Sequence, residues 1–206
     1  MTTETETARA VASDLLSHHE AAVRTSIELV DRVTGADLRK PTPCADWTLH
    51  GLLTHMIAQH YGFAAASRGV GDHDPWKPRR LGEDPAADYR AAAEHVLAAF
   101  AEPGVLERKF PLPEFSPTHL FPGAQAVGFH FIDYVVHSWD VAKTLGVAVV
   151  FDAEVLDAAR PVAAAVPGGS IRTAPGAAFA PEVPWSGSAA LDEIVALLGR
   201  APDWTN

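Results

Sequence analysis

With 206 residues, 48% of them hydrophobic and 20% charged, the chain is long enough to bury a core, and we expect one domain over residues 1–206. Its formal net charge of −10 argues against nucleic acid or an anionic membrane surface as a partner. A single cysteine excludes an intrachain disulfide and any multi-cysteine zinc or iron–sulfur site.

The chain begins with the acidic, polar stretch MTTETETARA, which lacks the apolar segment of a secretory signal. No later stretch is long and apolar enough to span a bilayer, and we expect a cytoplasmic protein.

Gly35 and Gly146 end the first and the fourth of the predicted helices. The spacing of apolar residues predicts helices over residues 6–33, 49–66, 85–100, 123–145, 153–166 and 191–198.

The segments between these helices are rich in proline and glycine. Pro41 and Pro43 exclude a helix in the stretch KPTPCAD. Either Asp46 or Thr48 is then expected to cap the second helix. The prolines of residues 103–119 predict an irregular loop or a short extended excursion.

Four of the predicted helices are long, and loops of uneven length join them. Strand signals are weak throughout the chain. This pattern indicates an all-α fold, with a helical bundle over about residues 6–146. A C-terminal extension over about residues 147–206 would carry the short additional helices.

The segment FHFIDYVVHSWD, Phe129–Asp140, carries the strongest functional signal. His130, Asp133 and His137 lie at i, i+3 and i+7 and share one face of the predicted helix. Most other positions are apolar, which is typical of a buried helix, so an ion pair on a solvated face is the weaker alternative. Imidazole and carboxylate are the ligands of catalytic zinc, iron and nickel sites, and burying them is costly unless something binds them. The segment therefore predicts a divalent metal site that needs at least one more ligand.

The missing ligand is expected from the second helix, which offers His50, His55 and His60. His60 falls in the middle of the apolar arc and His55 on its flank. Periodicity therefore slightly favours His60 as the more buried residue. Spacing alone leaves the choice between His55 and His60 open.

The stretch PTPCADWTLHGLLTHM, Pro41–Met56, resembles the opening signature of the DinB-type metal-binding superfamily, in the branch of the mycothiol-dependent maleylpyruvate isomerase-like proteins. The tail APEVPWSGSAALDEIVALLGRAPDW is similar to the end of that branch. The family's second signature, Glu-x3-His followed by a small residue, Trp and Asp, is matched from Asp133 onward with Asp in place of Glu. The resemblance implies a bundle of four antiparallel helices whose metal ion is held by His55, Asp133 and His137.

The replacement of Glu by Asp133 shortens the reach of the carboxylate by about 1–1.5 Å, which is large against metal–ligand distances. Either the helices approach more closely, or Asp133 orients a ligand histidine instead of binding the ion. His130 would in that case enter the coordination sphere as the reserve ligand. We rank His137 and His55 first, Asp133 next and His130 last.

Several further residues have a case for function. Cys44 precedes a helix N-terminus, where the thiol pKa falls, although it can equally be a small residue that fills a turn. Tyr134 is the phenol next to the predicted site and a weak candidate proton donor. Arg79, Arg80 and Arg172 lie in loops that could cover the bundle mouth and hold a substrate carboxylate, although exposed loop arginines are usually only solvated.

Two residues follow His137 directly. Asp140 is expected to accept a hydrogen bond from a ligand histidine or to cap a neighbouring helix, and Trp139 is expected in the core. Two imidazoles and one carboxylate leave a coordination position open, as in catalytic sites.

The resemblance implies a thiol-dependent isomerase or S-transferase, in which zinc, or else nickel or iron, binds mycothiol as the thiolate that attacks a small electrophile. The alternatives are a non-catalytic metal-binding or stress protein, and a metal-assisted hydrolase or lyase that activates water. The isomerases of this branch typically carry a further C-terminal domain for which this chain leaves little room, and this weakens the specific assignment to maleylpyruvate. A homodimer is one assembly open to the protein.

Overall fold

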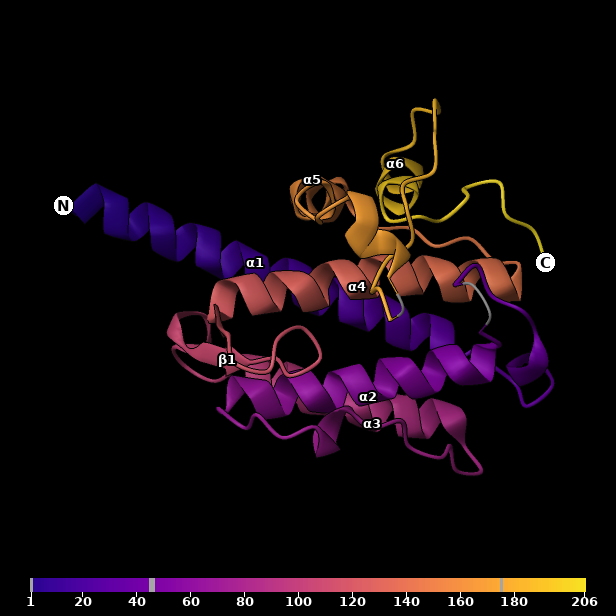
Figure 1. Cartoon of the computed structure of the whole chain (residues 1–206), viewed down its shortest axis with the longest axis horizontal. Helices are drawn as coiled ribbons and strands as arrows, with labels where there is room; N and C mark the ends of the chain where they lie inside the picture. Colours follow the sequence, from indigo (N-terminus) through magenta and orange to yellow (C-terminus); the bar gives the residue numbers. More distant parts are fainter. Residues whose placement is uncertain (1, 45–46, 175) are drawn as a thin grey trace.

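The computed structural model describes residues 2–44, 47–174 and 176–206, with side chains from residue 14 onward. The described part is mostly helical, and the predicted all-α fold is confirmed (Figure 1). The long elements are α1 (Thr2–Val30), α2 (Leu49–Ser67), α3 (Pro85–Phe100), α4 (Gly123–Leu145), α5 (Ala153–Ala164) and α6 (Ala190–Leu197). The short elements are the 3-10 turns η1 (Asp37–Arg39), η2 (Asp74–Trp76), η3 (Val105–Glu107) and η4 (Gly169–Thr173), and the strands β1 (Lys109–Pro111) and β2 (Leu120–Pro122). None of the described helices is long and apolar enough to cross a membrane.

Helices α2 and α4 face each other in opposite directions. His55 near the start of α2 packs against His137 in the second half of α4, and His60 one turn later packs against His130. Residue numbers therefore rise along one helix as they fall along the other. This antiparallel pairing brings the polar residues of both helices to one buried seam.

Helices α2 and α3 run in the same direction, so the bundle departs at this pair from the implied arrangement of four antiparallel helices. Tyr61 of α2 lies against His95 of α3, and Arg68 pairs with Glu102 just beyond the end of α3 at 2.9 Å. A parallel pair needs a connection that returns along the bundle, and residues 68–84 provide it. Within that connection, the Trp76 ring packs so closely over α2 that only a glycine, Gly62, fits beneath it.

The turn before α2 is held by backbone pairing. The backbone N–H of Leu49 donates to the Lys40 carbonyl at 2.9 Å, and Thr42 donates both its backbone N–H and its hydroxyl to the Trp47 carbonyl, at 3.1 and 3.0 Å. Thr48, one of the two predicted caps, caps α2 by accepting a hydrogen bond from the Gly51 N–H at 3.5 Å. The other predicted cap, Asp46, lies outside the described residues. The turn places Trp47 over the first turns of α2, beside Gly51 and with its ring centroid 4.7 Å from that of His55.

The prolines between α3 and α4 do not prevent local pairing. Residues 109–111 form β1 and pair antiparallel with β2, with Phe110 opposite Phe121. The extended alternative for residues 103–119 therefore holds at β1. Phe110 is fully buried and contributes to a core cluster between α2, α3 and the start of α4.

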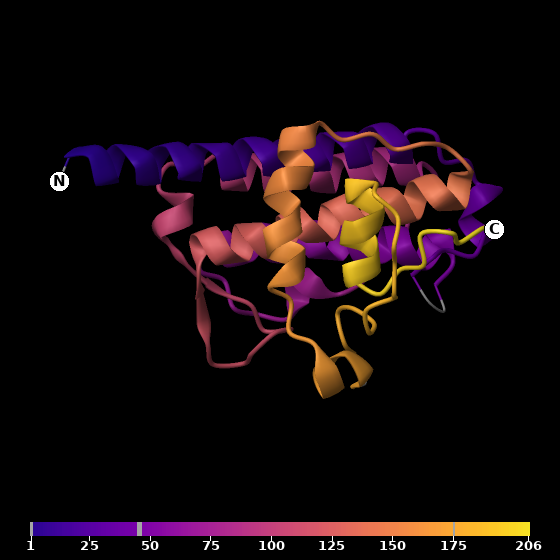
Figure 2. The same ribbon diagram turned by 90° about the horizontal axis from the view of Figure 1, so that it is seen from above.

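The segment after α4 packs on the outside of the bundle. Figure 2 shows α5 and α6 lying across α4, and α5 also contacts α1. Arg172 is buried and donates its guanidinium to the backbone carbonyls of Val166, Pro167 and Leu197. These bonds connect the parts of the segment after α4. The prediction that Arg172 lies in a loop at the bundle mouth and can hold a substrate carboxylate is therefore wrong.

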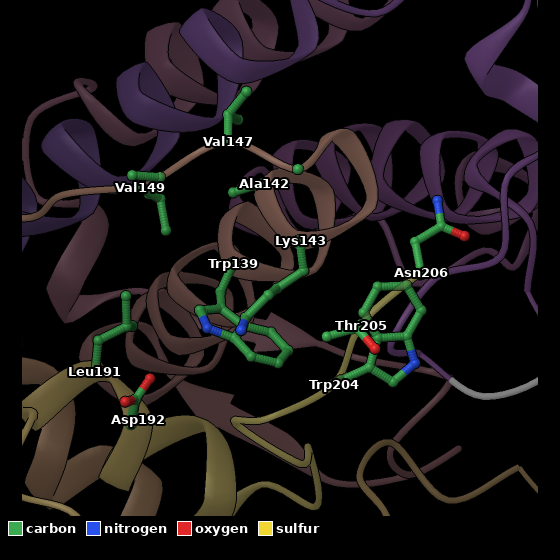
Figure 3. A pocket seen from close by; sticks show the side chains of 12 residues that line it. Trp139, Ala142, Lys143, Val147, Val149, Leu191, Asp192, Trp204, Thr205 and Asn206 are labelled. Atoms are coloured by element: carbon green, nitrogen blue, oxygen red, sulfur yellow. The ribbon is translucent and has the colours of Figure 1, made fainter.

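A surface pocket of about 510 Å³ lies between α4, α6 and the C-terminal tail (Figure 3). Trp139 and Trp204 form part of its wall, and Leu191 lies on the α6 side. Lys143 lies over the Trp139 ring and donates to the Pro202 carbonyl at 2.7 Å. Trp139 is 3% exposed, which agrees with the expectation that it belongs to the core.

Candidate metal centre

The structure brings His55, Asp133 and His137 together between α2 and α4. One nitrogen or oxygen from each lies within 4.8 Å of the other two. Nε2 of His137 is 3.3 Å from Oδ1 of Asp133, and the His55 and His137 rings meet edge to face with centroids 5.3 Å apart. Of the two histidines left open by spacing, His55 is the one that faces His137.

The spacing of these atoms fits a metal ion. A tetrahedral ion with bonds of about 2.0–2.2 Å holds its ligand atoms roughly 3.3–3.6 Å apart. The 3.3 Å between His137 Nε2 and Asp133 Oδ1 falls in that range. The shorter aspartate side chain can therefore share an ion with His137. The Asp133 side chain is 20% exposed, so the cluster has access to solvent on that side.

The other nitrogen of His137 is already used. Its Nδ1 lies 2.9 Å from Oδ2 of Asp140, and Asp140 is fully buried. Because a carboxylate accepts, Nδ1 carries the proton and Nε2 remains directed at the cluster. The expected hydrogen bond from a histidine to Asp140 is present, and the histidine is His137.

Asp140 is itself held by Arg200, which sequence reasoning did not single out. The Arg200 guanidinium donates to both Asp140 oxygens, from Nη2 at 3.2 Å and from Nε at 3.4 Å. It also donates to the Leu198 carbonyl at 3.0 Å, and the residue is 4% exposed. A buried chain of contacts thus runs from the C-terminal tail through Asp140 to His137. In the sequence, Arg200 was indicated only by the motif Leu-Leu-Gly-Arg-x-Pro, which ends the tail that is similar to the family branch.

The charges of the cluster set two opposite protonation states. Burial alone would lower the pKa of His137, but Asp133 and Asp140 outweigh burial and raise it to about 9. Burial lowers the pKa of His55 to about 4, and the charge of His137 adds to that effect. At neutral pH His55 therefore offers a free lone pair, whereas His137 binds a proton that a metal ion would have to displace.

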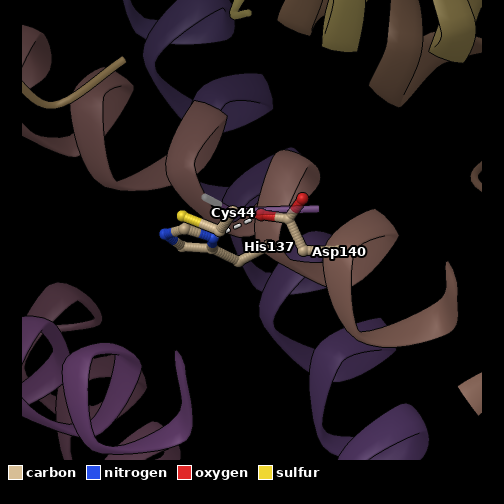
Figure 4. A group of neighbouring side chains, drawn as sticks. All are labelled: Cys44, His137 and Asp140. Atoms are coloured by element: carbon tan, nitrogen blue, oxygen red, sulfur yellow. Dashed lines mark hydrogen bonds and ion pairs between the residues drawn. The ribbon is translucent and has the colours of Figure 1, made fainter. Parts of the chain in front are cut away.

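Cys44 forms a second group with His137 and Asp140, again with all three ligand atoms within 4.8 Å (Figure 4). Nη2 of Arg200 lies 3.3 Å from the Cys44 sulfur as well as against Asp140. A guanidinium in contact with both groups opposes a second cation there. Burial raises the pKa of Cys44 to about 12, so the expectation of a lowered thiol pKa at this helix start is wrong. The alternative, a small residue that fills a turn, describes Cys44 better.

The remaining candidates lie outside the cluster. His130 is fully buried and its two nitrogens face His19 and His60, so it does not serve as the reserve ligand. Tyr134 is also buried, and its hydroxyl donates to the Met56 carbonyl, which occupies its proton.

The candidate arginines of the loop after α2 lie on the outside of the bundle. Arg79 packs over the Tyr61 ring with its guanidinium carbon 4.1 Å from the centroid, and Arg80 is exposed. Sequence reasoning missed Trp47, whose ring centroid lies 4.7 Å from that of His55 and which shields that ligand candidate. The sequence indicated Trp47 only through its position in the Trp-Thr start of the signature that resembles the family.

A helical bundle with one histidine on α2 facing an Asp-x3-His pair on α4 defines a DinB-like bundle of the metal-binding type. The family described as the mycothiol maleylpyruvate isomerase N-terminal domain matches residues 19–142, more than half of the chain. The chain belongs to that family.

Two uncharacterized proteins of Mycobacterium tuberculosis, from strains CDC 1551 and H37Rv, are each 30% identical to the chain over 190 residues. The alignment covers 91% of this chain and 98% of either relative. No solved structure matches the chain at a significant level. The family match includes every residue of the candidate metal cluster, whereas Arg200 lies beyond its end.

Proposed function

We propose that His55, Asp133 and His137 hold one divalent metal ion, with zinc favoured over nickel and iron. We further propose that the protein is a thiol-dependent isomerase or S-transferase that uses mycothiol against a small electrophile. The observation that carries the proposal is the convergence of three ligand atoms within 4.8 Å, with Asp140 directing His137 Nε2 toward the other two. Membership of the mycothiol-related family supports the choice of thiol.

An ion held by two neutral imidazoles and one carboxylate, with a position left open, would lower the pKa of a small thiol and yield its thiolate nucleophile. The chain's own residues prepare that arrangement. His55 is neutral at neutral pH, Asp133 supplies the negative charge, and Asp140 fixes the orientation of the His137 ring.

The state of the protein's own thiol also favours an external nucleophile. Cys44 is the single cysteine, and burial raises its pKa to about 12. Because the thiolate is the reactive form, Cys44 is inert at neutral pH. A thiol reaction at this site therefore needs a cosubstrate that brings its own sulfur.

Metal analysis and a thiol-transfer assay test the proposal together. The purified protein should hold about one zinc ion per chain, and His137→Ala should lose it, because one of three ligands is removed. His50→Ala is the matched control, since His50 is an exposed histidine of the same helix α2. The rate of mycothiol transfer to monobromobimane should exceed the uncatalysed rate only when the protein holds the ion.

Unchanged zinc occupancy in His137→Ala would refute the site. Zinc binding without any thiol transfer would leave a metal-binding protein and refute the transferase. Hydrolysis of an electrophile in the absence of thiol would instead assign water as the nucleophile.

A further inference from the structure

Three buried histidines form a row in the core next to the metal centre. His19 of α1, His130 of α4 and His60 of α2 are each at most 1% exposed. Nε2 of His19 lies 2.8 Å from Nδ1 of His130, and Nε2 of His130 lies 3.2 Å from Nδ1 of His60. The row thus connects three helices through two hydrogen bonds between imidazoles.

The arrangement is a chain and not a second metal site. His130 directs its two nitrogens at two different neighbours, so the three rings do not converge on one point. Burial lowers the pKa of His19 to about 3 and the pKa values of His60 and His130 well below the usual range. All three rings are therefore neutral, with one proton each.

Neutral imidazoles in a row have only two consistent arrangements. In one, every ring carries its proton on Nδ1, and His60 and His130 each donate to the next Nε2. In the other, every ring carries its proton on Nε2, and the donation runs the opposite way. The two arrangements differ at the end of the row: His60 Nε2 is a bare acceptor in the first and a donor in the second.

That end atom is the unsatisfied one. His60 Nε2 is buried and has no hydrogen-bond partner among the described residues. Leaving a buried polar atom unpaired costs about 1–3 kcal/mol, which is hard to explain as a contribution to core stability. A partner that enters from outside the chain accounts for it.

The unsatisfied end lies on the α2–α4 seam that also holds the metal centre. On α2, His60 follows His55 by five residues, an axial rise of about 7.5 Å, and on α4 His130 precedes Asp133 by three, about 4.5 Å. Tyr134, which follows Asp133 in the sequence, stacks its ring on both His60 and His130, with centroids 4.1 and 4.3 Å away. Burial dominates the pKa of His60, and the charge of Asp133 acts on it in the opposite direction. Asp133 is among the causes that shift the pKa of His60, whereas burial alone shifts the pKa of His19, so His60 is the end of the row nearer Asp133.

We propose that His60 Nε2 accepts the proton of a small thiol that enters the metal centre, and that the row carries a proton on to His19. The S–H bond breaks and an N–H bond forms at His60 Nε2, which leaves the thiolate. His60 passes its Nδ1 proton to His130 Nε2, His130 passes its Nδ1 proton to His19 Nε2, and His19 releases its own Nδ1 proton to solvent. His19 alone of the three retains any exposure, 1%.

The row ends neutral, with all three protons moved from Nδ1 to Nε2. A concerted shift suits these rings because burial disfavours a trapped imidazolium at each of them. The proposal rests on the proposed function, since it takes the substrate to be a thiol.

Nitrogen NMR of protein with isotope-labelled histidine tests the relay, because it distinguishes a protonated from a bare ring nitrogen. Zinc-loaded protein without thiol should show His19, His60 and His130 all protonated on Nδ1. Mycothiol should move all three to Nε2 and release about one proton per bound thiol. S-methyl mycothiol, a thioether without the proton, should bind and leave the three rings unchanged.

A mixed set of protonated nitrogens before thiol is added, or protons already on Nε2 in all three rings, would overturn the relay. Mycothiol binding, measured by calorimetry, without the exchange would overturn the relay alone and leave the proposed function standing. Failure of mycothiol to bind would refute both.

A variant pair adds a kinetic readout. His130→Gln interrupts the row and should slow proton release by at least about 100-fold while zinc occupancy is kept. His18→Gln is the matched control, because His18 neighbours His19 on α1 but stacks on Phe131 instead of joining the row. Equal rates of proton release in the two variants would contradict the relay. Should His130→Gln fail to fold, the thioether comparison in the unaltered protein decides.

Discussion

Zinc binding to the ion-free protein should be a competition with one proton. Asp133 and Asp140 raise the pKa of His137 to about 9, so at pH 7 the ring holds a proton that the ion has to displace. Two pH units correspond to about 3 kcal/mol, or roughly a 100-fold lower apparent affinity at pH 7 than at pH 9. His55 contributes nothing in this range because its pKa lies at about 4.

The expected profile follows from these values. The apparent zinc affinity should rise about tenfold per pH unit from pH 6.5 and level off above about pH 9. Titration calorimetry at pH 7, repeated in buffers of different ionisation enthalpy, should show about one proton released per ion. A flat affinity profile, or binding without proton release, would refute the charge state assigned to His137.

Stability gives a second readout with a defined sign. The folded pKa of His137 lies above the unfolded value of 6.5, so its protonation stabilises the ion-free fold below pH 6.5. That contribution, at most about 3 kcal/mol, should be lost as the pH rises through 9. Asp140→Asn removes one of the two charges that raise the pKa of His137. In this variant, the levelling off of zinc affinity and the loss of stability should both move to lower pH. An unchanged midpoint in that variant would mean that Asp140 does not set the pKa of His137.

Other substitutions test the remaining parts of the site by zinc titration and thermal unfolding. His55→Ala should lose zinc, whereas His60→Ala should retain it and lose about 1–2 kcal/mol of stability. The reverse result would show that the family resemblance implied the wrong histidine. Asp133→Asn should weaken zinc strongly if the carboxylate binds the ion, and about 10–100-fold if it only orients a ligand, while unchanged affinity would contradict both readings. Arg200→Gln should lower zinc affinity about 10–100-fold, and Arg160→Gln, which removes only an exposed ion pair of the same segment, should not.

The helices could be predicted closely because apolar periodicity and the Pro and Gly stops are local signals. The fourth helix was predicted at residues 123–145 and occupies those residues. Periodicity also identified His60 as the more buried of the two ligand candidates, and it is fully buried. Burial did not show which histidine faces His137, because that depends on how α2 and α4 are offset. The family signature supplied that choice.

The polar contacts between distant segments could not be predicted from the sequence. His19 gave no signal on its own, because the row it joins is assembled from three helices. Cys44 gave the wrong signal, because the effect of a helix start on a thiol is smaller than the effect of burial at this position. The local sequence pattern predicts on which face of its own helix a residue lies. The charge of a residue and its hydrogen-bond partners depend on side chains from other helices and loops, which the pattern does not show.

The contact between Arg200 and Asp140 joins the two parts of the chain chemically as well as by packing. The family match ends at residue 142, and Arg200 comes from a tail that reaches back over the bundle to the carboxylate beneath His137. Asp140 is fully buried, and a buried carboxylate is costly unless it is paired and hydrogen-bonded. The tail therefore supplies the positive charge that allows Asp140 to remain ionised after a metal ion has displaced the proton of His137. A bundle without this tail would retain the three ligand candidates but lack the charge that keeps the orienting carboxylate in place.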